Sequence, residues 1–257
     1  MTASAWNPAQ YERFQSERSQ PFYDLLALVR PKPGMRVVDL GCGTGELTRE
    51  LHRHLQARET LGVDSSDTML AKSAAFAGDG LRFERGDVRD FAAVGEYDLI
   101  FSNAVYQWVP GHGELLTRLT KGLKDGGQLA FQIPANDDYA SHTVAAALAA
   151  EFPFREAMGD YARQWPNLTP EGYAVLFDHL GYYEQLVRLQ VYGHHLGSRD
   201  EVVEWVKGSL LTDYEKRLTP DLYQHFLLRY RERLLPKLED RRPFFYPFKR
   251  ILCWARR

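Results

Sequence analysis

The chain contains 257 residues, with 32 Lys and Arg against 34 Asp and Glu, so its formal net charge at pH 7 is −2. Hydrophobic residues make up 44% and charged residues 26%, which are ordinary values for a globular protein. The near-neutral balance excludes a protein that binds nucleic acid through a broad basic face. The length suits one large domain with a sizeable core.

Targeting, membrane and metal signals are lacking in the sequence. Residues 1–14 lack the basic and apolar regions of a signal peptide. Apolar runs such as 144–150 are far shorter than the roughly 20 residues of a membrane span. Cys42 and Cys253 are too few for a disulfide framework, and no HExxH or CxxC pattern indicates a metal site. We therefore expect a cytoplasmic, monomeric protein without metal, membrane or nucleic-acid partners.

Short β-branched segments alternate with helical patterns over about the first 130 residues, which indicates a parallel α/β sheet. Strands are predicted at 36–40, 60–63, 81–85, 97–102 and 128–133. One helix is predicted at 46–56, and a second begins at Ser65 or Ser66 and turns Met69 inward. Leu115, Leu119 and Leu123 mark a third helix, which we expect to end at the following glycines.

The pattern becomes mainly helical after Pro134, and a strand at 184–192, helices at 199–211 and 220–235 and a strand at 244–255 follow. We interpret the chain as one domain with a doubly wound core and a helical cap over one end of the sheet. The predicted core comprises 19–135, 182–192 and 244–257, and the predicted cap comprises 1–18, 136–181 and 193–243. Open α/β sheets bind ligands beyond the carboxyl ends of their strands, so such a cap would enclose a ligand.

The strongest motif is VVDLGCGTG at residues 37–45, between a predicted strand and a predicted helix. Gly41, Gly43 and Gly45 allow the backbone to turn tightly and to approach a ligand closely. A dinucleotide fingerprint needs its third glycine at position 46, which is Glu46 here. Because a pyrophosphate would lie close to the carboxylates of this loop, the motif favours a cationic ligand such as S-adenosylmethionine.

Further polar residues fall at the carboxyl ends of the predicted strands. Asp39 lies inside the loop motif, and Asp64 is in the position that binds ribose hydroxyls. Asp87 is placed to accept from an adenine amino group, and Asn103 to offer its backbone carbonyl or side chain to the methionine ammonium. Cys42 is interpreted as a small side chain that fits beside the cofactor.

Together these motifs resemble the class I S-adenosylmethionine-dependent methyltransferases over residues 36–133. This resemblance implies a Rossmann-like sheet of seven strands whose last strand is antiparallel, with 184–192 and 244–255 as the closing pair. A closer resemblance, to the trans-aconitate 2-methyltransferase family, spans nearly the whole chain. It is carried by WNP at 6–8, Tyr11, Phe14, ERSQP at 17–21, QWVP at 107–110, His112, QIPAN at 132–136, Tyr192, His194, VEWV at 203–206, QHF at 224–226 and ARR at 255–257.

The family resemblance implies that the chain converts a carboxylate of a small tricarboxylic acid into a monomethyl ester. A carboxylic acid, with a reference pKa of roughly 4, is ionised at neutral pH, so no catalytic base is expected. Catalysis would come from proximity, alignment and exclusion of water. The predicted cofactor set is completed by Ser65, Met69, Val88, Trp108, Tyr11 and Arg18, the last as a candidate for the carboxylate of S-adenosylmethionine.

The carboxylates that are not methylated require cationic or hydrogen-bonding partners. The candidate substrate-binding residues are His112, Tyr192, His194, His195 and Arg199. Each has a structural alternative as a packed histidine or tyrosine or a solvated arginine. Three other functions stay open at this point: a methyltransferase for a phenol, an amine or an acyl-carrier carboxylate, a cofactor-binding module without activity, and a nicotinamide oxidoreductase.

Overall fold

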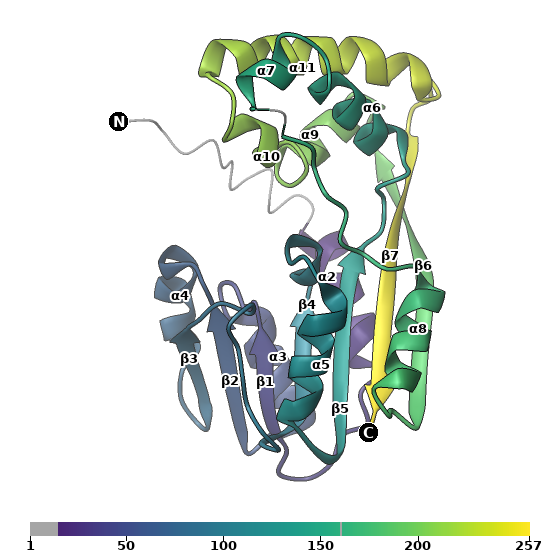
Figure 1. Ribbon diagram of the computed structural model, residues 1–257. Helices are drawn as coiled ribbons and strands as arrows, with labels where there is room; N and C mark the ends of the chain where they lie inside the picture. The colour runs from purple at the N-terminus through teal and green to yellow at the C-terminus, as the bar shows by residue number, and fades with distance from the viewer. Residues whose placement is uncertain (1–14, 160) are drawn as a thin grey trace. The chain divides into compact units, whose positions relative to one another are not determined.

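The computed structural model describes residues 15–159 and 161–257, with side chains from residue 19 onward (Figure 1). Contacts within the chain define two compact units. Among the described residues, unit 1 comprises Ala135–Trp165 and Val191–Lys249, and unit 2 comprises residues 15–134, Pro166–Gln190 and Arg250–Arg257. Relative to the predicted core and cap, which stay a prediction, residues 15–18 and 166–181 of the cap fall in unit 2, and residues 135, 191–192 and 244–249 of the core fall in unit 1.

Seven strands form one sheet in the order β3-β2-β1-β4-β5-β7-β6. Their bounds are β1 Arg36–Leu40, β2 Glu59–Asp64, β3 Leu81–Arg85, β4 Tyr97–Asn103, β5 Leu123–Pro134, β6 Glu184–Leu196 and β7 Phe244–Arg256. β1 pairs in parallel with β2 on one side and with β4 on the other. β3 pairs in parallel with β2, and β5 pairs in parallel with β4. The pairing of β5 with β7 is antiparallel. The predicted seven-stranded, Rossmann-like sheet with an antiparallel last strand is thus confirmed.

The strand order reverses at β1, because the chain builds β2 and β3 on one side of β1 and β4 and β5 on the other. In register, Asp39 of β1 lies beside Gly62 of β2 and Phe101 of β4. A crevice forms outside the carboxyl ends of the strands at such a reversal point. The segments that follow β1, β2 and β4 are therefore the ones that a ligand would meet.

Helices lie on both faces of the sheet in unit 2 (Figure 1). They are α2 Gln15–Leu26, α3 Glu46–Leu55, α4 Asp67–Ser73, α5 His112–Gly122 and α8 Pro170–His179, with short 3-10 turns at Ala74–Phe76 and Tyr106–Trp108. Cover on both faces explains why strand residues such as Val38, Ile100 and Phe131 are fully buried in continuous apolar runs. No helix in the described ranges is long and apolar enough to cross a membrane.

Three local predictions differ from the structure. Leu123 is not the last residue of a helix, because α5 ends at Gly122 and the extended Leu123 pairs with Tyr97 of β4. Met69 does not face inward on α4 but is 38% exposed. Of the helix predicted at 199–211, only Glu201–Lys207 is helical, and the next helix begins beyond that range, at Thr212.

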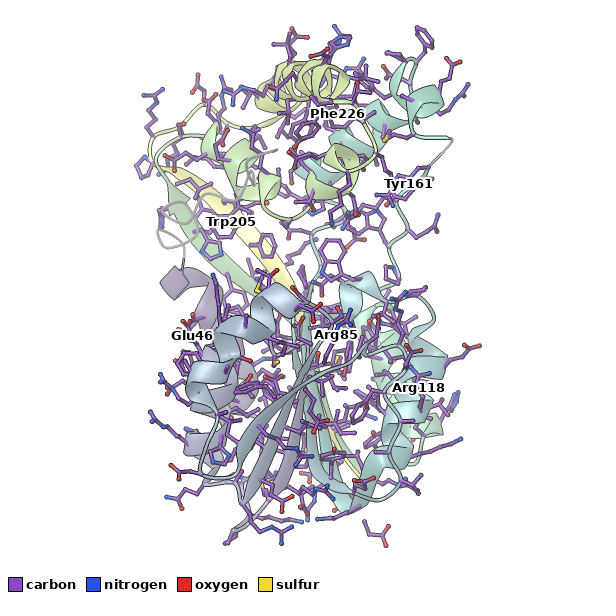
Figure 2. All side chains as sticks on the ribbon, turned by 90° about the vertical axis from the view of Figure 1, so that its left-hand side faces the viewer. Glu46, Arg85, Arg118, Tyr161, Trp205 and Phe226 are labelled. Atoms are coloured by element: carbon purple, nitrogen blue, oxygen red, sulfur yellow. The ribbon has the colours of Figure 1, made fainter. Side chains whose placement is uncertain are left out.

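Unit 1 is helical, with an aromatic core. Its helices are α6 Ala140–Ala149, α7 Phe154–Ala157, α9 Glu201–Lys207, α10 Thr212–Glu215 and α11 Pro220–Leu234, and a 3-10 turn follows at Leu235–Lys237. Phe226 of α11 stacks on Tyr214 with ring centroids 5.1 Å apart, and Trp205 of α9 packs against Tyr246 at 5.8 Å (Figure 2). The Tyr230 hydroxyl donates to the Ser141 carbonyl at 2.9 Å, so α11 is also fixed to α6 by a buried hydrogen bond.

A buried amide joins three segments of unit 2. Gln128 of β5 is fully buried, and its Oε1 accepts from the backbone N–H of Arg30 at 2.8 Å and from the indole N–H of Trp254 at 2.9 Å. Its Nε2 donates to the Arg30 carbonyl at 2.8 Å. The side chain thereby satisfies polar groups on the segment before β1 and on β7.

Gln128→Met is expected to lower the free energy of unfolding by roughly 2–4 kcal/mol, because it leaves several buried polar groups without partners. Gln185→Met, at an exposed glutamine whose Nε2 donates to Ala174, is the matched control and should change it by less than about 0.5 kcal/mol. Urea denaturation measures the free energy of unfolding of both variants. An equal decrease in the two would contradict the role given to Gln128.

Candidate functional site

The glycine loop joins β1 to α3 and turns at the carboxyl edge of the sheet. The Gly41 and Cys42 amides both donate to the Val63 carbonyl, at 2.7 and 3.0 Å, so the loop is fixed to the end of β2. Gly41 has φ +81°, and a side chain here would overlap Val105. Gly43 has φ +56°, but a Cβ there would have no protein atom within 4 Å. The loop thus has one face packed against protein and one open face, at Gly43.

Asp64, the last residue of β2, also holds the loop. Its Oδ2 accepts from the Gly43 amide and its Oδ1 from the Ser66 amide, both at 2.9 Å. Ser66 caps α4, which settles the choice between the two serines, and Ser65 is exposed. A carboxylate oxygen accepts about two hydrogen bonds, so Asp64 retains capacity for hydroxyl donors of a ligand.

Asp39 is a buried carboxylate with one satisfied oxygen. It is 4% exposed, and its Oδ2 accepts from the Thr48 hydroxyl of α3 at 2.6 Å. Burial raises the pKa of Asp39 to about 7, with a smaller contribution from the charge of Asp64, although the Thr48 bond acts in the opposite direction. The other oxygen, Oδ1, is buried without a hydrogen-bond partner among the described residues. An unsatisfied buried acceptor next to the open Gly43 fits a ligand that brings a cationic donor.

Cys42 is buried beside these two carboxylates. Burial and the charges of Asp39 and Asp64 raise the pKa of its thiol well above the ordinary range. A thiol with a raised pKa is a poor nucleophile, because the thiolate is the reactive form. The structure therefore gives Cys42 a packing position in the loop.

The segment after β3 carries Asp87 and Val88. The Asp87 carboxylate accepts from the backbone N–H of Arg89 at 2.8 Å and from its guanidinium, and these hydrogen bonds lower the pKa of Asp87 to about 2. Arg118 reaches this segment from α5 and donates to the carbonyls of Phe91 at 3.0 Å and Val88 at 3.4 Å (Figure 2). Asp87 is thus an ionised acceptor on a braced segment, but it already shares its oxygens with Arg89.

Asn103 ends β4, and its side-chain oxygen has a partner. The Oδ1 atom accepts from Gln132 Nε2 at 2.6 Å, which uses one of its two lone pairs, so the contact of Asn103 with an ammonium group stays a prediction. Trp108 lies in the 3-10 turn that follows and is 47% exposed. Two members of the predicted cofactor set cannot be assessed, because Tyr11 lies outside the described residues and only the backbone of Arg18, in α2, is described.

The structure places the candidate substrate residues in different environments. His112 belongs to unit 2 and is 2% exposed, with Nδ1 bonded to the Tyr173 hydroxyl at 2.5 Å and Nε2 to the Tyr106 carbonyl at 2.9 Å. Burial lowers its pKa, which favours the neutral ring. Arg199, in unit 1, donates to the carbonyls of Leu235 and Leu238 and to Asp240. Both side chains therefore hold their own units together, and their contact with a substrate stays a prediction.

The other three candidates lie on β6 within unit 1. Tyr192 and His194 are buried on one face of the strand, and His195 is exposed on the other, as the alternation of strand side chains requires. The His194 ring packs against Trp205 with centroids 4.7 Å apart. Of the two adjacent histidines, His194 is thus the buried one, and its contact with a substrate stays a prediction.

Sequence reasoning missed several charged and polar residues that the fold brings together. Thr48 reaches Asp39 from the facing helix, and Gln132 joins Asn103 to Arg250 of β7, whose Nη1 donates to Gln132 Oε1 at 2.9 Å. In unit 1, Arg163 is nearly buried, forms an ion pair with Asp213, and lies 4.6 Å above the Trp165 ring. No spacing in the sequence connects these pairs, because each joins separate elements. Among the described residues no three His, Cys, Asp or Glu side chains form a metal site.

Asp39→Asn is expected to stabilise the protein at alkaline pH. The folded chain retains the Asp39 proton up to about pH 7, against a reference pKa of 3.8, so this group lowers the free energy of unfolding as the pH rises through that interval. The variant lacks this titration. Its Tm should match that of the original protein near pH 4 and exceed it by roughly 10 °C at pH 8. A pKa difference of about 3 corresponds to about 4 kcal/mol, and 1 kcal/mol shifts Tm by roughly 2–4 °C at this size.

Differential scanning calorimetry across pH 4–8 checks this expectation. Asp125→Asn, at an exposed position of β5, is the control and should leave the pH dependence unchanged. A variant at position 39 that unfolds at a lower temperature at pH 8 would contradict the burial of an unsatisfied charge.

Comparison with known proteins gives a consistent family assignment. A family profile described as "Methyltransferase domain" matches residues 11–190. A trans-aconitate 2-methyltransferase of Deinococcus radiodurans is 42% identical over 98% of each chain, and one of Variovorax paradoxus is 36% identical over 98% of this chain and 95% of its own.

Solved structures agree on the fold. The YcgJ protein of Bacillus subtilis superposes with a TM-score of 0.61 at 15% identity, covering 91% of this chain and 98% of its own. An S-adenosylmethionine-dependent methyltransferase of Mesorhizobium loti does so with a TM-score of 0.51 at 21% identity, covering 93% and 98%. By its full-length similarity, its sheet order and its glycine loop, the chain belongs to the trans-aconitate 2-methyltransferase family.

Proposed function

We propose that the protein transfers a methyl group from S-adenosylmethionine to a carboxylate of trans-aconitate, or of a closely related polycarboxylic acid, and forms the monomethyl ester. The observation that carries the cofactor part is the buried Oδ1 of Asp39, which has no hydrogen-bond partner among the described residues, on the strand that leads into a loop open at Gly43. The acceptor part rests on relatives of 35–42% identity that are named trans-aconitate 2-methyltransferases.

The residues around the loop fit the parts of this cofactor. Asp39 Oδ1 would accept from its ammonium, which would also keep the Asp39 carboxylate ionised. Asp64 would accept from the ribose hydroxyls while it retains its bonds to the Gly43 and Ser66 amides. Asp87 and Val88 would line the adenine side. When bound, S-adenosylmethionine supplies an electrophilic methyl group on a positively charged sulfur.

The chain needs no base for this reaction. A carboxylate with a reference pKa of roughly 4 is already ionised at neutral pH and is the nucleophile. The protein residues therefore bind the two reactants, align them with each other and exclude water from them. Holding the reactants in the reacting geometry is itself a large contribution to the rate. Tyr192, His194 and His195 are candidates for binding the acid, and so are His112 and Arg199, although these two already have hydrogen-bond partners within their own units. A small-molecule acid as partner, a monomeric chain and a cytoplasmic location complete the proposal.

A panel of methyl acceptors tests the substrate. The purified protein is incubated with labelled S-adenosylmethionine and trans-aconitate, cis-aconitate, other di- and tricarboxylates, a neutral phenol or an amine. We expect transfer to polycarboxylates, into a product that releases its label as methanol on mild alkaline hydrolysis. Transfer to the phenol or amine alone would contradict a carboxylate acceptor and assign the enzyme to that other substrate class. Tight binding of the cofactor without transfer to any acid would indicate a cofactor-binding module without activity.

Gly43→Ala tests the cofactor site, with Gly95→Ala as a matched control. The two glycines have nearly equal φ, +56° and +60°, and an added Cβ meets no protein atom at either. Both variants should lose about 1–2 kcal/mol of stability from left-handed backbone strain. By calorimetric titration only Gly43→Ala should bind S-adenosylmethionine at least about tenfold more weakly, or about 1.4 kcal/mol. Equal affinity of the two variants for S-adenosylmethionine would contradict the assignment of the glycine loop to the cofactor site.

A further inference from the structure

Side chains from β4, β5 and β7 form a chain of hydrogen bonds within unit 2. Arg250 Nη1 donates to Gln132 Oε1 at 2.9 Å, and Gln132 Nε2 donates to Asn103 Oδ1 at 2.6 Å. Arg250 is 9% and Gln132 1% exposed, so the middle of this chain is shielded from water. Hydrogen bonds in series within a shielded region polarise one another.

The direction of these bonds is fixed by chemistry. A guanidinium carries only donors, so the Gln132 atom that faces Arg250 must be its oxygen. The other end of the Gln132 amide is then the NH₂ group, which can only donate, so the Asn103 atom that faces it must also be oxygen. Asn103 is left with Nδ2 as its outward group. Its bond to Gln132 is the one that the structure gives this side chain within the described residues.

This donor lies beside the glycine loop. Phe101 of β4 pairs with Asp39 of β1, so Asn103, two residues further along, is level with Gly41 just past the end of β1. Val105, two residues after Asn103, occupies the space that a side chain at Gly41 would need. The Asn103 side chain therefore leaves the sheet at the point where the strand order reverses.

We propose that Asn103 donates through Nδ2 to a carboxylate of one of the two reactants, and that Gln132 and Arg250 are positioning residues that fix this orientation. The inference rests on the proposed function and refines it. Asn103, expected from the sequence to accept from the methionine ammonium, becomes a donor to a carboxylate. The carboxylate belongs either to the methionine part of S-adenosylmethionine or to the acid substrate. Both sources present the same group to Nδ2.

Two isosteric variants should replace the outward hydrogen-bond donor of residue 103 by an acceptor. Asn103→Asp keeps an oxygen toward Gln132 and turns a second, negatively charged oxygen outward. Gln132→Glu still accepts from Arg250 but presents an oxygen to Asn103, which must then rotate its NH₂ group inward. Both variants should weaken binding of the same reactant by roughly tenfold or more, as expected for loss of a hydrogen bond to a charged group.

Titration with S-adenosylmethionine and with its decarboxylated form, together with kcat and KM for trans-aconitate, distinguishes the two sources. If the cofactor carboxylate is bound, both variants lose affinity for S-adenosylmethionine while affinity for the decarboxylated form stays the same. If the substrate carboxylate is bound, cofactor affinity stays within about twofold, and KM for trans-aconitate rises about tenfold with little change in kcat. Either pattern supports the proposal.

Arg250→Lys and Arg250→Met test the positioning role. Lysine retains a donor toward Gln132 and should preserve most of the affected binding, whereas methionine should reproduce the loss seen in Gln132→Glu. Gln185→Glu, at an exposed position of the same unit, controls for the added charge and should leave both constants unchanged. Thermal unfolding of every variant identifies a loss that is only structural, which would affect both reactants alike.

Unchanged constants in Asn103→Asp and Gln132→Glu would overturn the inference while the proposed function stands. Tighter binding of S-adenosylmethionine by Asn103→Asp would also overturn it, because that result would place the ammonium beside this residue. If the unaltered protein neither binds S-adenosylmethionine nor methylates an acid, the proposed function fails first and the inference fails with it.

Discussion

The buried carboxylate of Asp39 is the constraint on which the rest of the site depends. A charge at 4% exposure is costly unless it is paired, and the described residues pair only one of the two Asp39 oxygens, with Thr48. The consequence is a raised pKa and an oxygen that lacks a partner within that part of the chain. The fold tolerates this cost because α3, which carries Thr48, begins directly after the glycine loop and brings the hydroxyl back onto β1.

The surrounding elements maintain this arrangement. The Gly41 and Cys42 amides are bound to the Val63 carbonyl, and the Gly43 amide is bound to Asp64, so the end of β2 fixes the loop that follows β1. Such a loop is already in place before a ligand arrives, which reduces the entropy lost on binding. The carboxylates of Asp39 and Asp64 place negative charge at the glycine loop, and the side-chain NH₂ group proposed as a donor on Asn103 lies in register with the same loop. A ligand with both a cationic and an anionic group would match that pattern.

The histidines and arginines illustrate how tertiary contacts decide the role of a residue type. His112 stands beside a motif of the family, yet both of its ring nitrogens are bonded inside unit 2. Arg199 follows a strand that carries two histidines, yet its guanidinium satisfies the end of the 3-10 turn at Leu235–Lys237. Arg250 received no role from its sequence position, and the fold gives it one through Gln132. A cationic side chain becomes available to a ligand only when the backbone carbonyls and carboxylates nearby do not bind it first.

The sequence by itself determined the sheet and the loop. Buried strands read as continuous apolar runs, glycines mark turns, and acids follow the strands, so β1 and β3 are predicted to the residue and the GxGxG loop is recognised. These signals are local, because they depend on residues within one element or at its ends. The Thr48 bond to Asp39, the Asn103–Gln132–Arg250 chain and the burial of His112 were decided only by the tertiary structure. They join residues 9, 29, 118 and 61 positions apart, and no pattern of hydrophobicity or spacing encodes which side chains meet across a sheet.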